Sequence, residues 1–550
     1  MPLVRKHLSE KGTEFKKHYA TTAVCCPSRV TLWTGRFAHN TNVTDVSPPY
    51  GGYPKFLAQG YNDNYFPVWL QEAGYNTYYT GKLFNAHTVE NYNSPPPGGF
   101  TGSDFLLDPF TYAYLNSTFQ RNGQEPRSYE GQYSTDVLAE KAYGLLDEAI
   151  DAGKPFFLVA APIAPHANVV MKAGSPKGGR HDIDSIYFTE PVPAERHEHL
   201  FKDVKVPRTA NFNPDEPSGA NWIHMLPQQN ATNVEYNDHF YRQRLRALQA
   251  VDELVEGLVE RLEQHGLLED TYVVYSSDNG FHIGQHRLQP GKSCGYEEDV
   301  NVPLIVRGPG VAAGYVADGV TTTHADLAPT FFDLLGIPPK AEFDGSAIPV
   351  EKAKFEEEKL AGRRREHAAI EYWGFAMGEG IYNRNPLEHN TYKAIRLSGP
   401  GYNLYYSVWC NNEHELYDMN ADPGQLHNLL SSSATSAPVL AAGHPADKVA
   451  ARLDALLLVL KTCAAETCQQ PWRQIHPDGS VESLEDALAR RYDGYYEDKR
   501  AARVEYSYCA NGFIEDAEGP TWQANGRPFG YRYEELELRD GDEARWEDWV

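Results

Sequence analysis

The first two thirds of the chain alternates between amphipathic helical patterns and short, almost continuously apolar runs. Apolar residues recur at helical spacing over 135–153 and about 239–265, and runs typical of buried strands occupy 156–163, 271–275 and 302–306. Strands that alternate with helices join into a sheet that helices cover on both faces. The sequence therefore predicts an α/β fold with a mostly parallel sheet sandwiched by helices.

The pattern changes toward the C-terminus. Short segments of alternating polarity at 392–397, 402–409 and 415–418 are separated by turn residues, which is typical of an antiparallel sheet. We expect two units: an α/β domain over 1–385, and a smaller α+β subdomain over 386–550 that is built on a short antiparallel sheet and ends in a solvated acidic tail.

Composition restricts the kind of partner. The 550 residues carry a formal net charge of −25, and 41% of them are hydrophobic, as in a globular protein. A nucleic-acid or anionic-membrane partner would require a basic surface, and no apolar run approaches the roughly 18 residues of a membrane span. We therefore expect no nucleic acid and no membrane as partner, and any site for an anion must be a local basic pocket.

Residues 25–36, Cys-Cys-Pro-Ser-Arg-Val-Thr-Leu-Trp-Thr-Gly-Arg, form the most specific motif in the chain. A cysteine at a helix start, with Pro27 in the first helical position, would by itself be ordinary. Eight positions, however, match the pattern C-x-P-S-R-x-x-L-x-T-G-R, and through them the chain resembles the sulfatase family. The matching residues are Cys25, Pro27, Ser28, Arg29, Leu32, Thr34, Gly35 and Arg36.

The resemblance implies an unusual nucleophile at Cys25. In sulfatases a formylglycine-generating enzyme oxidises this cysteine to formylglycine (3-oxoalanine), whose hydrate is a geminal diol. One hydroxyl attacks the sulfur of a sulfate ester, and the other later loses its proton to expel sulfate, a route that a serine lacks. Arg29 lies one helical turn further on, and we expect it to hold the diol because a guanidinium keeps its charge.

Further candidate residues follow the predicted strands. Lys82, His166, Asp278 and Asn279 each come within a few residues of a strand end, and open parallel sheets bind ligands at that edge. Each of them alone fits an ordinary loop or turn. They nevertheless stand in the order that the family has behind its signature, where the histidine at the place of His166 helps to protonate the leaving group.

The resemblance also assigns roles to the other polar residues. Asp278 and Asn279, together with the modified Cys25, are expected to ligate a hard divalent ion, Ca²⁺ or a similar metal, that polarises the sulfate. Lys82 and Lys292 are expected to hold the sulfate group, and Lys292 also meets the leaving oxygen. Stabilisation of the charge that spreads over the sulfuryl group should be the main catalytic effect.

One segment departs from the common family pattern. Residues 81–85 read Gly-Lys-Leu-Phe-Asn, whereas many sulfatases have Gly-Lys-Trp-His there. In this respect the chain resembles the branch that contains glucosamine-6-sulfatases and fungal arylsulfatases. Asn85 and His87 are the two candidates to replace the missing histidine, and the sequence does not choose between them.

The start of the chain departs more strongly. Sulfatases carry two metal-binding aspartates at the end of a first core strand, a few tens of residues before the modified cysteine. Here 24 residues precede Cys25, and their only acids, Glu10 and Glu14, lie in a helix-like stretch. We expect that strand and both aspartates to be missing. Either the sequence is an incomplete version of a secreted enzyme, or the product is truly truncated, inactive and open at the centre of its sheet.

Cysteines and glycosylation sequons indicate the secretory route. If Cys25 is modified, six cysteines remain, and the four nearest the C-terminus allow two disulfides with three possible pairings. These four are Cys410, Cys463, Cys468 and Cys509. Sequons at Asn42, Asn116 and Asn230 fit a secreted glycoprotein. The first residues, in contrast, do not form a signal peptide.

The sequence therefore predicts a sulfuric ester hydrolase of the arylsulfatase type that acts on a small-molecule or sugar sulfate ester. The alcohol part of the ester is not identified. Two alternatives stay open. Relatives that share C-x-P-S-R hydrolyse phosphonate or phosphate monoesters, and a truncated, inactive sulfatase-like chain would act only as a binding protein.

Overall fold

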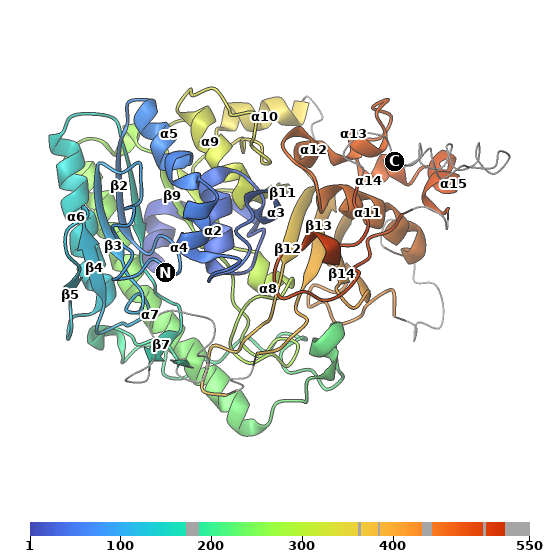
Figure 1. The fold of residues 1–550 in the computed structure, drawn as a ribbon, viewed down its shortest axis with the longest axis horizontal. Coiled ribbons are helices and arrows are strands. Elements are labelled where there is room, and N and C mark those ends of the chain that lie inside the picture. The colour runs from blue at the N-terminus through green and yellow to red at the C-terminus, as the bar shows by residue number, and fades with distance from the viewer. Residues whose placement is uncertain are drawn as a thin grey trace.

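The strands of the α/β region form two sheets. Figure 1 shows these strands together with the helices around them. The computed structural model describes residues 1–171, 186–360, 365–382, 386–431, 440, 443–498 and 502–522. The first sheet has the order β11-β1-β10-β9, and its strands are β1 (Thr13–Tyr19), β9 (Val273–Ser276), β10 (Leu304–Arg307) and β11 (Tyr315–Thr323). The second has the order β5-β4-β3-β2-β6, and its strands are β2 (Asn76–Gly81), β3 (Gly102–Leu106), β4 (Thr118–Arg121), β5 (Arg127–Ser128) and β6 (Phe156–Ala161).

Strand directions place several strand ends on the same edge. β1 pairs in parallel with β11 and antiparallel with β10, and β10 pairs antiparallel with β9, so β1 and β9 run the same way. β2 lies between β3 and β6 and is parallel to both, with Asn76 opposite Phe156. The remaining pairs, β3 with β4 and β4 with β5, are antiparallel. The predicted α/β class is confirmed, but the sheets are mixed rather than mostly parallel, since three of their seven described strand pairs are parallel and four are antiparallel.

The stretch before Cys25 differs from its expected helix-like form. A helical segment covers only α1 (Pro2–Val4) and a π-helical turn at Arg5–Ser9. Glu14 lies on β1, where side chains alternate toward the core, with Phe15 buried. The burial of Phe15 and Tyr19 and the pairing of β1 with two neighbouring strands outweigh the local helical pattern.

β6 and β9 are the facing edges of the two sheets. Among the described residues each has one strand neighbour, β2 for β6 and β10 for β9, and the side chains of both strands are half-buried. Both strands pack against the same apolar cluster, which includes Leu146 and Ile305. No described strand joins the two sheets at this place.

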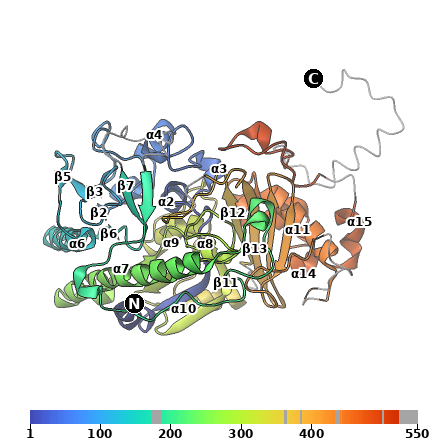
Figure 2. The ribbon, with the colours of Figure 1, turned by 90° about the horizontal axis from the view of Figure 1, so that it is seen from below.

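Two long helices cover the α/β region. α6 (Ser134–Asp151) buries the predicted apolar face and packs against α7 (Ala231–Gln264), which Figure 2 shows running along the lower side of the molecule. α7 begins eight residues before the predicted start because the side chain of Asn230 accepts a hydrogen bond from the backbone N–H of Asn233 and caps the helix there. The shorter elements are α3 (Ala38–Thr41), α4 (Gly52–Ala58), α5 (Phe66–Glu72), α8 (Glu297–Val300), α9 (Leu327–Leu334), α10 (Lys352–Leu360), β7 (Asn168–Met171) and β8 (Ile186–Thr189).

The antiparallel sheet has the order β12-β13-β14-β15 and agrees with the predicted C-terminal subdomain. Its strands are β12 (His367–Tyr372), β13 (Tyr392–Gly399), β14 (Tyr402–Trp409) and β15 (His414–Asp418). β12 precedes residue 386, so the sheet takes one strand from the region 1–385. The helices that follow are α11 (Ala446–Leu460), α12 (Glu466–Gln469), α13 (Pro471–Ile475), α14 (Leu484–Ala487) and α15 (Asp493–Tyr496). The acidic tail lies outside the described residues.

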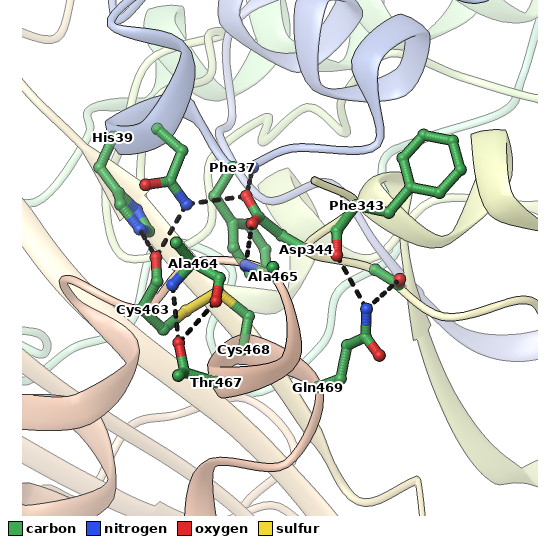
Figure 3. The surroundings of a disulfide bond; sticks show 12 residues. Phe37, His39, Phe343, Asp344, Cys463, Ala464, Ala465, Thr467, Cys468 and Gln469 are labelled. Atoms are coloured by element: carbon green, nitrogen blue, oxygen red, sulfur yellow. Dashed lines mark hydrogen bonds between the residues drawn. A yellow bond between two sulfur atoms is a disulfide. The ribbon is translucent and has the colours of Figure 1, made fainter. Parts of the chain in front are cut away.

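Two disulfides resolve the three possible pairings: Cys410 bonds to Cys509, and Cys463 bonds to Cys468. Figure 3 shows how the second disulfide loop contacts the α/β region. The Cys463 carbonyl accepts a hydrogen bond from His39 Nε2, and the Ala465 N–H donates to Asp344. The loop therefore ties the C-terminal helices to α3 and to the segment after α9. Within the described part of the chain, no helix is both long and apolar enough to cross a membrane.

Candidate active site

Parallel strand ends bring most of the predicted site residues together. Cys25 is the first residue of α2 (Cys25–Thr34), which follows β1. Lys82 comes directly after β2, His166 lies five residues after β6, and Asp278 lies two residues after β9. Within its own sheet β1 runs the same way as β9, and β2 runs the same way as β6. The contacts described below show that the residues after these strand ends meet, which is where open α/β sheets bind ligands.

Lys292 reaches this edge from the loop between β9 and α8, and its ammonium group has three partners. Its Nζ lies 3.4 Å from Cys25 Sγ, 3.1 Å from Glu379 Oε1 and 3.0 Å from His166 Nε2. An ammonium can only donate, so His166 Nε2 accepts its proton. His166 Nδ1 then carries the ring proton and donates it to the Ala167 carbonyl at 2.8 Å. His166 Nε2 is therefore directed at Lys292.

Arg29 and Lys82 surround Asp278. Arg29 Nε donates to Asp278 Oδ2 at 2.8 Å, and Nη1 of the same guanidinium donates to the Lys82 carbonyl at 2.6 Å. Lys82 Nζ lies 4.0 Å from the same carboxylate oxygen. Ser28 Oγ also donates to the Asp278 carbonyl, at 2.5 Å. Two residues of the helix that Cys25 begins thus fix the loop that follows β9.

The buried charges shift the pKa values of the site. Burial would raise the pKa of the Cys25 thiol, but the ammonium groups of Lys292 and Lys82 outweigh it and lower that pKa to about 5. Burial would also raise the pKa of Asp278, yet Arg29 and Lys82 hold it well below its usual range. Burial lowers the pKa of Lys82, whereas the pKa of Lys292 is raised because Cys25 and Glu379 outweigh its burial. An anionic group at the position of Cys25 is therefore stabilised.

The predicted metal ligands are only partly assembled. The Asn279 Oδ1 atom is buried and has no hydrogen-bond partner among the described residues, which fits an oxygen ligand. Asp278 supplies a carboxylate beside it, although Arg29 already pairs with one of its oxygens. Ca²⁺ takes six to eight oxygen ligands. These two residues fit a hard divalent ion as part of a coordination shell.

Two further residues at the site were not found by sequence reasoning. Tyr112 packs its ring against His166, with centroids 4.3 Å apart, and lies 4.9 Å from Lys82 Nζ. Glu379 contacts Lys292. Neither residue belongs to the signature or follows a predicted strand of the α/β region, so the sequence pattern carried no signal for them.

The structure separates the two candidates for the missing histidine. Asn85 Nδ2 donates to the Tyr112 hydroxyl at 2.7 Å, so Asn85 reaches the site through that tyrosine. His87 instead packs against the rings of Tyr53 and Phe105, and burial lowers its pKa to about 4. Neither ring nitrogen of His87 has a hydrogen-bond partner among the described side chains. Of the two, Asn85 lies next to the site.

A cavity of about 260 Å³ borders Lys292. Its walls are mostly apolar and combine the segment between β12 and β13 with the segment before α7 and the loop between β9 and α8. The lining residues are Trp222, Leu226, Pro227, His282, Arg287, Leu288, Gln289, Lys292, Ala376, Met377, Gly378 and Leu387. His282 is fixed there by a 2.9 Å contact between its Nδ1 and the Asp299 carboxylate. The cavity has room for an organic group beside the basic residues.

Buried cations surround a cysteine at a helix start, and they stabilise an anionic group at that position. A sequence model described as Sulfatase matches residues 1–337, and one described as N-sulphoglucosamine sulphohydrolase, C-terminal, matches residues 284–442. The chain belongs to the sulfatase family, and it is an enzyme of that family.

Named relatives agree with this assignment. The chain is 38% identical over 526 residues to an arylsulfatase of Volvox carteri. The aligned region covers 92% of this chain and 78% of the relative. It is 41% identical over 416 residues to sulfatase ppz1 of Metarhizium majus, covering 76% and 86%. A protein solved in complex with its substrate, D-glucosamine-2-N,6-O-disulfate, shares the fold with a TM-score of 0.60 at 23% identity, covering 78% of this chain and 88% of that one.

Proposed function

We propose that the chain hydrolyses sulfate esters of small molecules or sugars, with a formylglycine made from Cys25 as the nucleophile. The observation that carries the proposal is the 3.4 Å contact between Lys292 Nζ and Cys25 Sγ. Lys82 and Arg29 lie around the same point, in a chain whose net charge is −25. A cluster of cations in an acidic protein supports an anionic substrate at that point.

The proposed roles follow from the contacts of each side chain. Lys82 and Lys292 hold the sulfate group and stabilise the charge that develops on it. Lys292 and His166 meet the leaving oxygen, since Lys292 Nζ and His166 Nε2 share one proton at 3.0 Å. Arg29, which donates to Asp278, holds the diol because its guanidinium keeps its charge. The formylglycine hydrate would supply one hydroxyl for attack and a second for release of sulfate.

We also propose a divalent metal, Ca²⁺ or a similar hard ion. Asp278 and Asn279 would hold it together with the modified Cys25, and it would act as a Lewis acid on the sulfate. The buried, unpartnered Oδ1 of Asn279 supports this assignment. Maturation would require a formylglycine-generating enzyme as partner.

The cavity beside Lys292 is our candidate for the alcohol half of the ester. Its lining combines Trp222, Leu288 and Met377 with the polar groups of His282 and Gln289. Small-molecule sites of this composition bury most of their ligand against apolar walls and orient it through a few polar atoms. We propose that an organic group attached to sulfate binds here.

We propose a secreted glycoprotein, organised as a catalytic domain over 1–385 and a C-terminal subdomain over 386–550 whose sheet also takes β12 from the first region. Two disulfides support the oxidising compartment, because such bonds persist in secreted proteins and are rare in the cytosol. The sequons at Asn42, Asn116 and Asn230 support glycosylation. Enzymatic deglycosylation of secreted protein, followed by mass measurement, tests this point.

Initial rates on an aryl sulfate, an aryl phosphate and an aryl phosphonate test the proposed reaction. We expect the sulfate ester to be hydrolysed fastest by protein produced in cells that can oxidise the cysteine. Preference for the phosphate or the phosphonate would favour the phosphonate or phosphate monoester hydrolase alternative. Absence of hydrolysis of all three would favour an inactive sulfatase-like binding protein.

Cys25→Ala and Cys26→Ala provide a matched pair for the nucleophile. Both cysteines are buried, and burial raises the pKa of Cys26 to about 12, so its thiol stays neutral. We expect Cys25→Ala to abolish turnover and Cys26→Ala to retain it, with both proteins folded by circular dichroism. Turnover at the wild-type rate in Cys25→Ala would refute the assignment.

A further inference from the structure

Glu379 lies at the site although it comes from the segment between β12 and β13. Two backbone contacts hold it there. The Glu379 N–H donates to the Pro290 carbonyl, at 2.6 Å, and Gly378 forms an antiparallel bridge with Gly291. Both contacts are to residues immediately before Lys292. The segment is therefore attached to the loop that delivers the lysine, and the glutamate and the lysine are placed together.

The Glu379 carboxylate faces the two groups that we assign to the leaving oxygen. Oε1 accepts a hydrogen bond from Lys292 Nζ at 3.1 Å, and Oε2 lies 3.7 Å from His166 Nε2. The side chain is 8% exposed. Oε2 is buried and has no hydrogen-bond partner among the described residues. A buried carboxylate oxygen without a partner is costly, and such atoms concentrate where a site binds or reorganises.

The ammonium group of Lys292 depends on the Glu379 carboxylate for its position. Lys292 is faced by Lys82, which disfavours its charge, and by Cys25, Asp278, His166 and Glu379. Glu379 is the only one of these that is a carboxylate in hydrogen-bond contact with Nζ among the described residues. Without it, the ammonium would keep only His166 and the group at position 25 as direct partners, and it could turn away from either.

We propose that Glu379 is a positioning residue that holds Lys292 and His166 against the leaving oxygen, an inference that rests on the proposed sulfate ester hydrolysis. As the attacking hydroxyl of the diol bonds to sulfur through its oxygen, it loses its proton to solvent. When the bond between sulfur and the alcohol oxygen breaks, its electron pair stays on that oxygen, and one proton passes to it from the Lys292–His166 pair. The second hydroxyl of the diol loses its proton as sulfate is expelled, and that proton returns to the pair. Glu379 exchanges no proton.

Leaving-group dependence separates this role from a purely structural one. An alkoxide is a poorer leaving group than a nitrophenolate, so its departure depends more on a well-placed proton donor. In Glu379→Gln we expect kcat to fall about tenfold to a hundredfold on alkyl sulfates and less on nitrophenyl sulfate, with KM little changed. A plot of log kcat/KM against leaving-group pKa should therefore be steeper for the variant than for wild type.

Glu371→Gln is the matched control, because Glu371 is also buried and also contacts a lysine and a histidine, Lys393 and His39. In the folded protein it should leave the leaving-group plot unchanged. An equal loss on all esters in Glu379→Gln, or no loss, would overturn the inference. If Glu379→Gln does not fold, Glu379→Asp, which keeps the charge but shortens the reach, is judged by the same plot.

The wild-type rates distinguish the two proposals. Wild-type protein that carries the aldehyde but hydrolyses no sulfate ester would contradict the proposed function, and the role of Glu379 would fall with it. Active wild-type protein with an unaltered plot for Glu379→Gln contradicts only the role of Glu379.

Discussion

Two buried glutamates each bridge a lysine and a histidine, one at the active site and one where the antiparallel sheet meets α3. At the sheet, Glu371 Oε1 accepts from the His39 backbone N–H at 3.0 Å, and Oε2 accepts from His39 Nδ1 at 2.8 Å and from Lys393 Nζ at 2.9 Å. His39 Nε2 donates to the Cys463 carbonyl at 2.8 Å, as Figure 3 shows. We call this set the junction cluster.

The site cluster, Glu379 with Lys292 and His166, is less completely paired. One oxygen of Glu379 has no hydrogen-bond partner among the described residues. At the junction cluster, in contrast, both oxygens of Glu371 accept hydrogen bonds and both ring nitrogens of His39 donate. Fully satisfied polar groups stabilise a single conformation. The difference suggests what each set does: the junction cluster fixes two parts of the chain, and the site cluster keeps bonding capacity for a substrate.

The largest effect that separates the two regions should be on metal content. Asp278→Ala removes the carboxylate next to Asn279 and should lose bound Ca²⁺, because a hard ion needs anionic oxygen ligands. Glu371→Gln should keep the same calcium content as wild type, since the oxygens of Glu371 are used by His39 and Lys393. Metal analysis of purified proteins checks this, and unchanged calcium in Asp278→Ala would remove that residue from the metal site.

Replacing each lysine gives the next effect. Lys292→Met should lower kcat by about a hundredfold to a thousandfold, the cost of removing one donor that stabilises developing charge. Lys393→Met should leave kcat of the folded protein unchanged and lower its thermal stability. Steady-state kinetics and thermal unfolding of both variants provide the measurement. A near-normal kcat in Lys292→Met would exclude the lysine from catalysis.

Breaking the junction cluster should destabilise the protein. Glu371→Gln removes the carboxylate that contacts both His39 and Lys393 and leaves Glu518, 3.8 Å from Lys393 Nζ, as the remaining carboxylate beside the lysine. Removal of one member of a buried ion pair costs about 3 to 5 kcal/mol. Chemical denaturation should show this loss in the free energy of unfolding. A loss well under 1 kcal/mol would mean that the cluster does not hold the sheet to α3.

The smallest expected effect is a change with pH in the stability that Glu371→Gln removes. The sign of this change follows from the pKa shifts of Glu371 and His39. Burial would raise the pKa of Glu371, but His39 and Lys393 outweigh it and lower the pKa from 4.5 to about 2. Its stabilising contribution is therefore present above pH 4.5 and is lost as the pH falls toward 2. Burial would lower the pKa of His39, yet Glu371 raises it above 6.5, so its contribution is present below pH 6.5 and is lost as the pH rises.

Consequently the difference in unfolding free energy between wild type and Glu371→Gln should be largest between about pH 4.5 and 6.5. It should shrink on both sides of that window. Denaturation curves at a series of pH values test this. A difference that does not vary with pH would show that the two groups are not linked to folding in the way their contacts indicate.

The sequence predicted those parts of the fold and site that depend on local pattern. Periodicity located α6 and β6, and the strand ends located Lys82, His166 and Asp278, because parallel strands carry their carboxyl ends to one edge.

The rest depended on contacts between distant segments. Glu379 is 87 residues from Lys292 and is placed by hydrogen bonds to the backbone of residues 290 and 291, which no local pattern reports. Tyr112 similarly reaches Asn85 and His166 from an irregular segment. The pairing of the four C-terminal cysteines was open for the same reason, because it depends on which strands and helices lie together.

The most direct test of the whole account is the mass of the peptide that contains Cys25, recovered from protein made in cells that can oxidise it. The account predicts the mass of the aldehyde, formylglycine, at this position and intact thiol at Cys26. A peptide that carries an unmodified thiol at Cys25 in such protein would contradict it.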